Sequence, residues 1–321
     1  MTISNSPQSP KRLLSVLGPV DPVLTGVFDA HNHVWIERLP GVSAQAPFLD
    51  DEIRIRTELI DFAANGGSGL ADCQPGGCGR NGNRLAELAR RTGLIIIGCT
   101  GFHRQIYYPP NTTMFTMPAD EISRYFIAEI QTGMTETLVN PAPVRAGFIK
   151  IALEKSLQDT PQAALEAAIQ AAMATGAAME IHTEKGAAAE EMLAFCTVHG
   201  LAPEKLVLCH MDKRPDPGLH CELAKAGTML EYDTFFRPKY APEQNLWPLI
   251  RHMVNAGLEA HVACATDLAE KIQWKQFGGE PGISALPQVI APHLTDQGYP
   301  PETVQRLTGG NILNRLAFAF T

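Results

Sequence analysis

Residues 146–211 read AGFIKIALEKSLQDTPQAALEAAIQAAMATGAAMEIHTEKGAAAEEMLAFCTVHGLAPEKLVLCHM, and this stretch decides the fold. Three short runs rich in apolar residues, at 146–153, 177–183 and 205–211, are separated by two longer segments with helical spacing. The first longer segment follows Thr160-Pro161 and ends at Gly176, and the second ends at Gly200. These are start and stop signals typical of helices. Short apolar strands that alternate with helices favour parallel pairing of the strands.

The same alternation extends over most of the chain, with further helical spacing at 119–137 and 219–226. Eight strand-like runs are present, namely Val27–Val34, Ser68–Gln74, Leu94–Thr100, Ala146–Leu153, Ala177–Thr183, Lys205–Met211, Thr228–Thr234 and His261–Asp267. Eight such units predict an α/β protein closed into a (β/α)₈ TIM barrel. An open doubly wound sheet is the alternative, and it is disfavoured because neither a GxGxxG motif nor a P-loop follows a strand.

The expected organisation is a short N-terminal extension at residues 1–25 that lies on the barrel, followed by a single barrel domain at residues 26–321. The longest loop after a strand, Gly101–Pro118, is rich in Pro, Tyr, Asn and Thr. Loops that follow strands build the active site of a barrel, so this loop is a candidate substrate loop or lid.

Composition and charge exclude several classes of function. The 321 residues are 45% hydrophobic and 19% charged, as in ordinary globular proteins, and the net charge is −8. A negative chain without a basic cluster is a poor candidate for nucleic-acid binding. No apolar run of about 18 residues is present, so no membrane span is expected. Seven cysteines without a CxxC pair favour a reduced, cytoplasmic enzyme that acts on a small molecule.

Polar residues with metal-ligating side chains stand at the ends of several predicted strands. The first strand carries His31 and His33, which alternation places on one face. Two imidazoles that converge on one point suit a divalent transition metal, although a lone HxH motif also occurs as two hydrogen-bonded polar residues.

The later strands add four more candidate ligands. The fourth carries Lys150, whose ammonium is costly to bury unless it is paired, neutralised or converted by CO₂ into an anionic carbamate. The fifth, sixth and eighth end at His182, His210 and Asp267. Each could be a satisfied polar residue or a rim salt bridge if taken alone. Six such residues at one rim predict instead a two-metal hydrolytic site.

This arrangement of strand-end residues resembles the phosphotriesterase-like family of the amidohydrolase superfamily. The step of 32 residues from Lys150 to His182 and the step of 28 residues to His210 are family-like. The tail GGNIL at 309–313 is similar to the family's terminal Asn-containing segment. The segment FGGEPG at 277–282 resembles the GGGPG stretch of members that open sugar lactones, several of them phosphorylated.

The resemblance implies a role for each strand-end residue. His31, His33 and Asp267 would bind the more buried metal, and His182 and His210 the more exposed one. Lys150, as an N6-carboxylysine, would bridge the two metals together with a hydroxide. Lys150 and Asp267 would also act in catalysis, because Asp267 would take the hydroxide proton and pass it to the leaving group. Zinc is the expected metal, with manganese, cobalt or iron as alternatives.

Substrate contacts are expected from loops that follow strands three, seven and eight. The candidates are His103, Tyr108, Arg237, Lys239 and Lys271. His103 follows strand three, where relatives often carry an aromatic residue that faces the substrate. The cations could clamp a carboxylate or phosphate of the substrate. Glu270 departs from the arginine that phosphate-binding relatives tend to carry there, and this weighs against phosphate recognition.

The sequence therefore predicts a binuclear metal-dependent hydrolase that attacks a lactone carbonyl, with a sugar lactone or another small lactone, neutral or anionic, as substrate. A phosphotriesterase or an N-acyl amide hydrolase using the same two-metal site is the alternative, because spacing cannot separate these electrophiles. A non-catalytic barrel is disfavoured by the intact set of six ligands. Relatives are often dimers, so a homodimer is expected.

Overall fold

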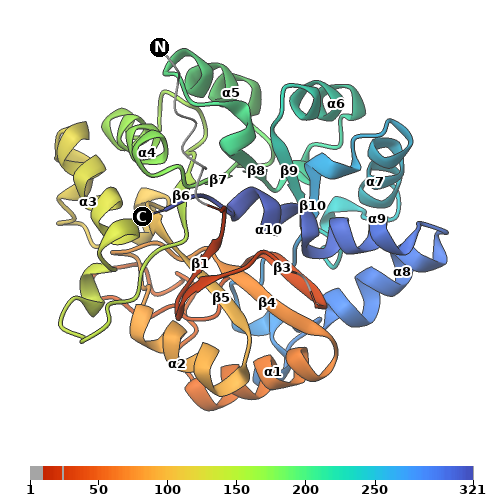
Figure 1. The fold of residues 1–321 in the computed structure, drawn as a ribbon, viewed down its shortest axis with the longest axis horizontal. Coiled ribbons are helices and arrows are strands. Elements are labelled where there is room, and N and C mark those ends of the chain that lie inside the picture. Colours follow the sequence, from red (N-terminus) through yellow and green to blue (C-terminus); the bar gives the residue numbers. More distant parts are fainter. Residues whose placement is uncertain (1–9, 24, 321) are drawn as a thin grey trace, which may run out of the picture.

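A computed structural model describes residues 10–23 and 25–320 as a barrel of parallel strands surrounded by helices (Figure 1). The eight-stranded sheet has the order β10-β9-β8-β7-β6-β5-β4-β3, and every pair in it is parallel. The strands are β3 (Val27–Asn32), β4 (Gly67–Asp72), β5 (Ile95–Gly101), β6 (Phe148–Ala152), β7 (Met179–His182), β8 (Leu206–Cys209), β9 (Met229–Tyr232) and β10 (Val262–Cys264). Each lies within, or within a residue of, one of the eight apolar runs. The predicted (β/α)₈ barrel is confirmed.

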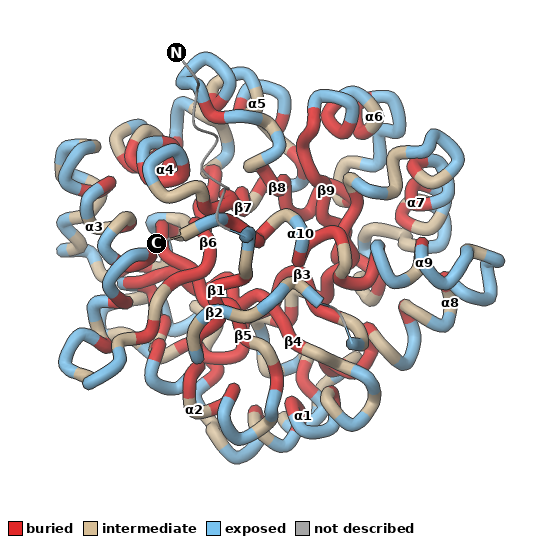
Figure 2. Tube along the Cα trace, viewed as in Figure 1, coloured by how far each residue is buried: buried red, intermediate tan, exposed pale blue. Residues whose placement is uncertain are grey.

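Helices connect successive strands and cover the outside of the barrel, and further helices follow the last strand. The connecting helices are α1 (Glu52–Ala64), α2 (Gly82–Thr92), α3 (Ala119–Gln131), α4 (Gln162–Thr175), α5 (Ala189–Val198), α6 (Pro217–Lys225) and α7 (Leu246–Asn255), and those that follow the last strand are α8 (Ala291–Asp296), α9 (Pro301–Gln305) and α10 (Asn311–Leu316). Figure 2 shows buried residues concentrated in the strands and exposed residues on the outer faces of the helices.

Helix ends follow the signals in the sequence in most places. Helix α4 ends at Gly176, which adopts a left-handed conformation (φ 77°) that favours glycine. The segment predicted as helical over 119–137 is shorter in the structure, because α3 ends at Gln131. Beyond it, Glu129 Oε1 accepts a hydrogen bond from the backbone N–H of Thr135 at 3.0 Å and holds a separate turn.

Side chains close the barrel between its first and last strands. Asp29 on β3 accepts hydrogen bonds from the backbone N–H and the hydroxyl of Thr266, which follows β10. Asn32 donates to Asp29 at 2.9 Å and to Thr266 Oγ1 at 2.8 Å. The backbone N–H of Asp267 donates to the carbonyl of His31 at 2.9 Å. This seam brings the ends of β3 and β10 together.

The opposite, amino-terminal end of the barrel is covered by a hairpin and by α10, which lie over its centre in Figure 1. The hairpin pairs β1 (Leu13–Ser15) with β2 (Gly18–Val20). Leu13 packs in the core cluster that contains Phe28 and Phe148, and the Val16 N–H donates to the carbonyl of Ile96. Residues 1–9 and 24 of the expected N-terminal extension, and Thr321, lie outside the described residues. In the described part of the chain, no helix is long and apolar enough to cross a membrane.

Candidate active site

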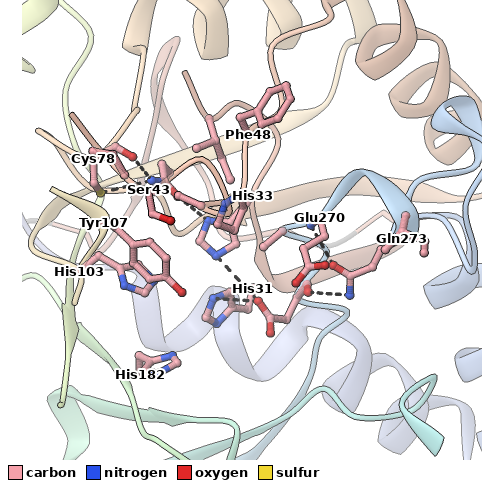
Figure 3. A pocket seen from close by; sticks show the side chains of 18 of the residues that line it. His31, His33, Ser43, Phe48, Cys78, His103, Tyr107, His182, Glu270 and Gln273 are labelled. Carbon is pink, nitrogen blue, oxygen red and sulfur yellow. Dashed lines mark hydrogen bonds and ion pairs between the residues drawn. The ribbon is translucent and has the colours of Figure 1, made fainter. Parts of the chain in front are cut away.

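A cavity of about 690 Å³ opens at the carboxyl ends of the strands. Its floor is formed by the strand-end residues singled out in the sequence, namely His31, His33, His182, His210 and Asp267. Its walls come from the loops after β3, β4, β5, β8, β9 and β10. Figure 3 shows several of these wall residues, such as Phe48, Cys78 and Tyr107. In barrel enzymes this end of the strands is where catalytic residues gather, whereas the opposite end serves stability.

Four imidazoles converge on the floor of this cavity. The ring centroid of His31 lies 5.4 Å from that of His33 and 5.0 Å from that of His210. The rings of His182 and His210 are 4.7 Å apart. Burial, followed by the neighbouring charges, lowers the pKa of His31 and His210 well below the ordinary value and that of His33 to about 3. The rings are therefore neutral, the form that binds a metal.

A hydrogen-bond acceptor orients three of these rings from behind. Nδ1 of His31 lies 2.8 Å from Glu231 Oε1, and Nδ1 of His33 lies 2.8 Å from Gln74 Oε1. Nδ1 of His210 is hydrogen-bonded to Asp233. An ionised carboxylate and an amide oxygen only accept, so with Glu231 and Asp233 ionised each Nδ1 carries the proton and each Nε2 keeps its lone pair. Burial raises the pKa of both carboxyl groups and works against that form. Metal-bound histidines in proteins are held in this way.

Asp267 stands between these rings and a rim arginine. Its Oδ1 lies 3.7 Å from His31 Nε2 and 3.8 Å from His33 Nε2. Its Oδ2 accepts a hydrogen bond from Arg237 at 2.7 Å. Burial raises the pKa of Asp267, but the nearby cations, Arg237 first and then Lys213, outweigh burial and hold it well below its ordinary value. The carboxylate is therefore ionised.

Lys150 lies directly beneath the imidazoles, fully buried inside the barrel. Its Nζ is 3.4 Å from both ring nitrogens of His31 and 3.4 Å from Cys209 Sγ. Burial lowers the pKa of Lys150, but the acidic groups around it, which include Cys209, Glu180 and Glu231, outweigh burial and raise it. Cys209, Glu180 and Glu231 form a buried cluster with His31, in which one ligand atom from each residue lies within 4.8 Å of the others.

These residues fit a divalent metal site of nitrogen and carboxylate ligands, the donor set that suits zinc and its neighbours in the first transition row. His31, His210 and Asp267 form a compact ligand group, with atoms within 4.8 Å of one another. Nε2 of His182 is buried and, among residues 10–23 and 25–320, has no hydrogen-bond partner. A buried nitrogen without a partner is rare in native structures, and a metal-site role accounts for it.

The structure brings some of the predicted substrate residues to the cavity and places others elsewhere. His103, Arg237 and Lys239 line it. Tyr107 is part of the wall, whereas Tyr108 is buried behind it and accepts a hydrogen bond from the backbone N–H of His103. Lys271 is not among the residues that line the cavity. Its Nζ lies 3.4 Å from Asp50 Oδ1 and 3.5 Å from the ring centroid of Phe48.

Four residues at the site were not predicted: Gln74, Glu231 and Asp233, which orient the imidazoles, and Lys213, which lines the cavity. One signal was available. Glu231 and Asp233 are two residues apart in an otherwise apolar run, and alternation points both into the barrel. A polar pair on the inner face of a strand is unusual, because barrel interiors are mostly filled by branched apolar side chains.

Comparisons with known proteins identify the family of the chain. The sequence matches the phosphotriesterase family over residues 11–312. It is 28% identical to the phospho-furanose lactonase of Mycoplasmopsis synoviae, over 95% of this chain and 91% of that protein. It is 24% identical to the N-acetyltaurine hydrolase of Rattus norvegicus, over 96% of this chain and 98% of that protein. The crystal structure of a lactonase from Listeria monocytogenes superimposes with a TM-score of 0.84, at 23% identity, over 97% and 99% of the two chains.

Proposed function

The chain belongs to the phosphotriesterase family, a metal-dependent hydrolase family, and we propose that it opens a small lactone at a two-metal site. The observation that carries the proposal is the convergence of four neutral imidazoles, an ionised Asp267 and a buried Lys150 beneath one cavity. The similarity to a phospho-furanose lactonase supports a lactone as the substrate.

In this proposal His31, His33 and Asp267 would hold one ion, and His182 and His210 would hold the other. Lys150 would supply a further anionic ligand as a carbamate, formed when its neutral amine adds to CO₂ and releases a proton. Divalent ions at such a site lower the pKa of water and polarise the substrate carbonyl. Zinc is the proposed metal, and elemental analysis of the purified protein tests this choice.

Asp267 is the group that moves the proton. A water oxygen forms a bond to the lactone carbonyl carbon, and the bond between that carbon and the ring oxygen breaks. Asp267 accepts the proton of the attacking water and transfers it to the departing ring oxygen, so that the product is a hydroxy acid. Its contact with Arg237 keeps the carboxylate ionised.

The rim of the cavity favours a substrate that carries an anionic group. Lys213, Arg237 and Lys239 all line it and come from the chain after β8 and β9. A carboxylate or phosphate on the lactone would find these cations within the same cavity. Glu270 also lines the cavity, and its carboxylate would repel an anion on that side. We therefore expect the anionic group of the substrate to lie near the residues that follow β8 and β9.

A second candidate is an N-acyl amide hydrolase, favoured by the similarity to an N-acetyltaurine hydrolase. The same cations would serve an anionic amide equally well. A neutral phosphotriester is a weaker candidate, because triesters require an apolar pocket rather than a cationic rim. We further propose that the protein is cytoplasmic and forms a homodimer. Light scattering on the purified protein tests the oligomeric state.

A proton-release screen of the metal-loaded enzyme tests the proposal. The panel contains sugar lactones with and without a phosphate, acyl-homoserine lactones, N-acyl amino compounds and one aryl phosphotriester, with Lys150→Ala as the blank. Fast opening of lactones, absent from the blank, is the expected result. Turnover of the amides or the triester alone would replace the lactone by that substrate. Turnover of nothing by a protein that holds two metals would overturn all three substrates.

A further inference from the structure

We infer that His103 is a catalytic residue, a neutral imidazole whose Nε2–H donates a hydrogen bond to a substrate oxygen. The inference rests on the proposed hydrolase function and assigns a specific role at that site. His103 lies in the loop after β5 and lines the cavity. Figure 3 shows its ring beside Tyr107 and facing His182 across the cavity.

The hydrogen bond to Nδ1 fixes which ring nitrogen carries the proton. The backbone N–H of Arg104 donates to His103 Nδ1 at 2.7 Å. A nitrogen that accepts a hydrogen bond carries a lone pair and no proton, so the proton of the neutral ring is on Nε2. A doubly protonated ring would place two N–H groups against each other at this distance.

This arrangement is the reverse of that at the metal-ligand imidazoles. His31, His33 and His210 each donate from Nδ1 to an oxygen and keep a lone pair on Nε2. His103 uses its Nδ1 lone pair internally and offers Nε2–H instead. A metal requires a lone pair, whereas a substrate oxygen requires a donor. Of the five imidazoles that line the cavity, these three are prepared for a cation and His103 is prepared for an oxygen.

The chain around His103 holds this donor in place. The backbone N–H of His103 donates to the Tyr108 hydroxyl at 3.0 Å. The next residue, Arg104, reaches Glu154 at 3.1 Å and Glu184 at 2.8 Å, which anchors the loop to the ends of β6 and β7. The edge of the Tyr107 ring packs on the imidazole, with centroids 4.8 Å apart. A donor fixed before the substrate binds stabilises developing charge without reorganisation.

The position of the ring identifies the oxygen that it serves. His103 lies 5.5 Å from His182 and 6.3 Å from His33, between centroids. Within the described residues, no oxygen is hydrogen-bonded to its Nε2. A lactone carbonyl lying over these residues gains negative charge on its oxygen as water adds, and Nε2–H is the neutral donor available to it. The proton stays on His103, so no base is required to restore it.

Two substitutions separate the donor from the ring. His103→Phe keeps a planar ring without a donor, and His103→Gln supplies an amide N–H of similar reach. The loss of one such donor lowers kcat by about 10²–10³-fold. We expect that loss in His103→Phe, at least a tenfold recovery in His103→Gln, and the zinc content and Tm of the parent in both. His199→Phe, at the exposed position that ends α5, is the control and should retain full activity.

The tautomer provides a readout that requires no substrate. Long-range ¹H–¹⁵N NMR of the zinc-loaded protein should show one ring, absent from His103→Phe, that is protonated at Nε2 while Nδ1 has no proton. A proton on Nδ1, loss of zinc in His103→Phe, or undiminished kcat in that variant would overturn the inference. If lactones are inert, the variants are compared on whichever panel substrate the enzyme hydrolyses. An enzyme that hydrolyses none would overturn the catalytic role together with the proposed function.

Discussion

Removal of the acceptor behind His31 tests how this barrel prepares its metal ligands. Glu231 is fully buried, and its Oε1 lies 2.8 Å from His31 Nδ1. Substitution Glu231→Met keeps a chain of similar length and leaves the Nδ1–H of His31 without an acceptor in the barrel interior. An unsatisfied buried donor costs about 1–3 kcal/mol. This cost destabilises the orientation of the His31 ring that binds the metal, so metal affinity should drop by about 10–100-fold.

Two matched variants give this prediction its specificity. Glu231→Gln retains an oxygen that can accept from Nδ1 and removes the charge, so its affinity should fall by less than about tenfold. Glu180→Gln alters the other buried glutamate of the same cluster. Glu180 accepts a hydrogen bond from Cys73 Sγ at 3.0 Å rather than from an imidazole. Its effect on metal affinity should be smaller than that of Glu231→Met.

The assay is competition for zinc between the protein and a chromogenic chelator, with circular dichroism to confirm that each variant is folded. If Glu231→Met retains zinc as tightly as the parent, the hydrogen bond does not orient His31. If Glu231→Gln and Glu231→Met weaken zinc equally, the charge of the carboxylate matters and the orientation of the ring does not. Either result would refute the reasoning.

Three further predictions concern other parts of the site. Lys150→Ala should lower the amount of bound metal, measured by elemental analysis. It should also lower kcat by at least about a hundredfold. Full metal occupancy together with the parent kcat would exclude the bridging role. Arg237→Gln should lower kcat for every lactone, because Arg237 also holds Asp267, and should in addition raise KM for anionic lactones by about tenfold or more relative to neutral ones. Lys271→Gln, at a residue that does not line the cavity, should do neither. A KM change equal for anionic and neutral lactones would remove Arg237 from anion recognition. Burial raises the pKa of Asp72 to about 7, so its folded form keeps a proton that the unfolded chain releases above about pH 4. This group therefore stabilises the fold at low pH and loses that contribution as pH rises to about 7. In the metal-free protein, the free energy of unfolding of Asp72→Asn minus that of the parent should rise by about 1 kcal/mol per pH unit between about pH 4 and pH 7. Urea titrations in which this difference does not change with pH would contradict the prediction.

The barrel was predictable because its signals are local. Each strand is a short apolar run, and helices such as α4 have a glycine at their end. The strand-end ligands were predictable for a related reason, since parallel strands deliver their carboxyl ends to one rim. The helix predicted over 119–137 is too long. The segment after Gln131 is held in a separate turn by a hydrogen bond from the backbone N–H of Thr135 to the side chain of Glu129, and apolar spacing does not reveal such a contact.

Contacts between distant segments were beyond the reach of the sequence. His31 and Glu231 are 200 residues apart, so polarity could mark each residue without pairing them. The choice between Tyr107 and Tyr108 depends on the turn at Gln105–Tyr107, which directs one ring into the cavity and buries the other. Lys271 appears equivalent to Lys239 in the sequence, but Asp50 and Phe48 draw it out of the site.

Backbone conformation explains why one ligand reaches the cavity against the alternation rule. Cys209 points into the barrel, where its Sγ meets Lys150, so the next residue should point outward. His210 has φ 64°, a left-handed conformation, and this turn at the strand end redirects its ring over the mouth of the barrel. Asp267, with φ 47°, ends the last strand run in the same way. Such conformations cost on the order of 1–3 kcal/mol in residues other than glycine, and they persist where surrounding contacts hold them. Asp233 holds His210 and Arg237 holds Asp267, so the groups that orient the two side chains also stabilise the backbone that presents them.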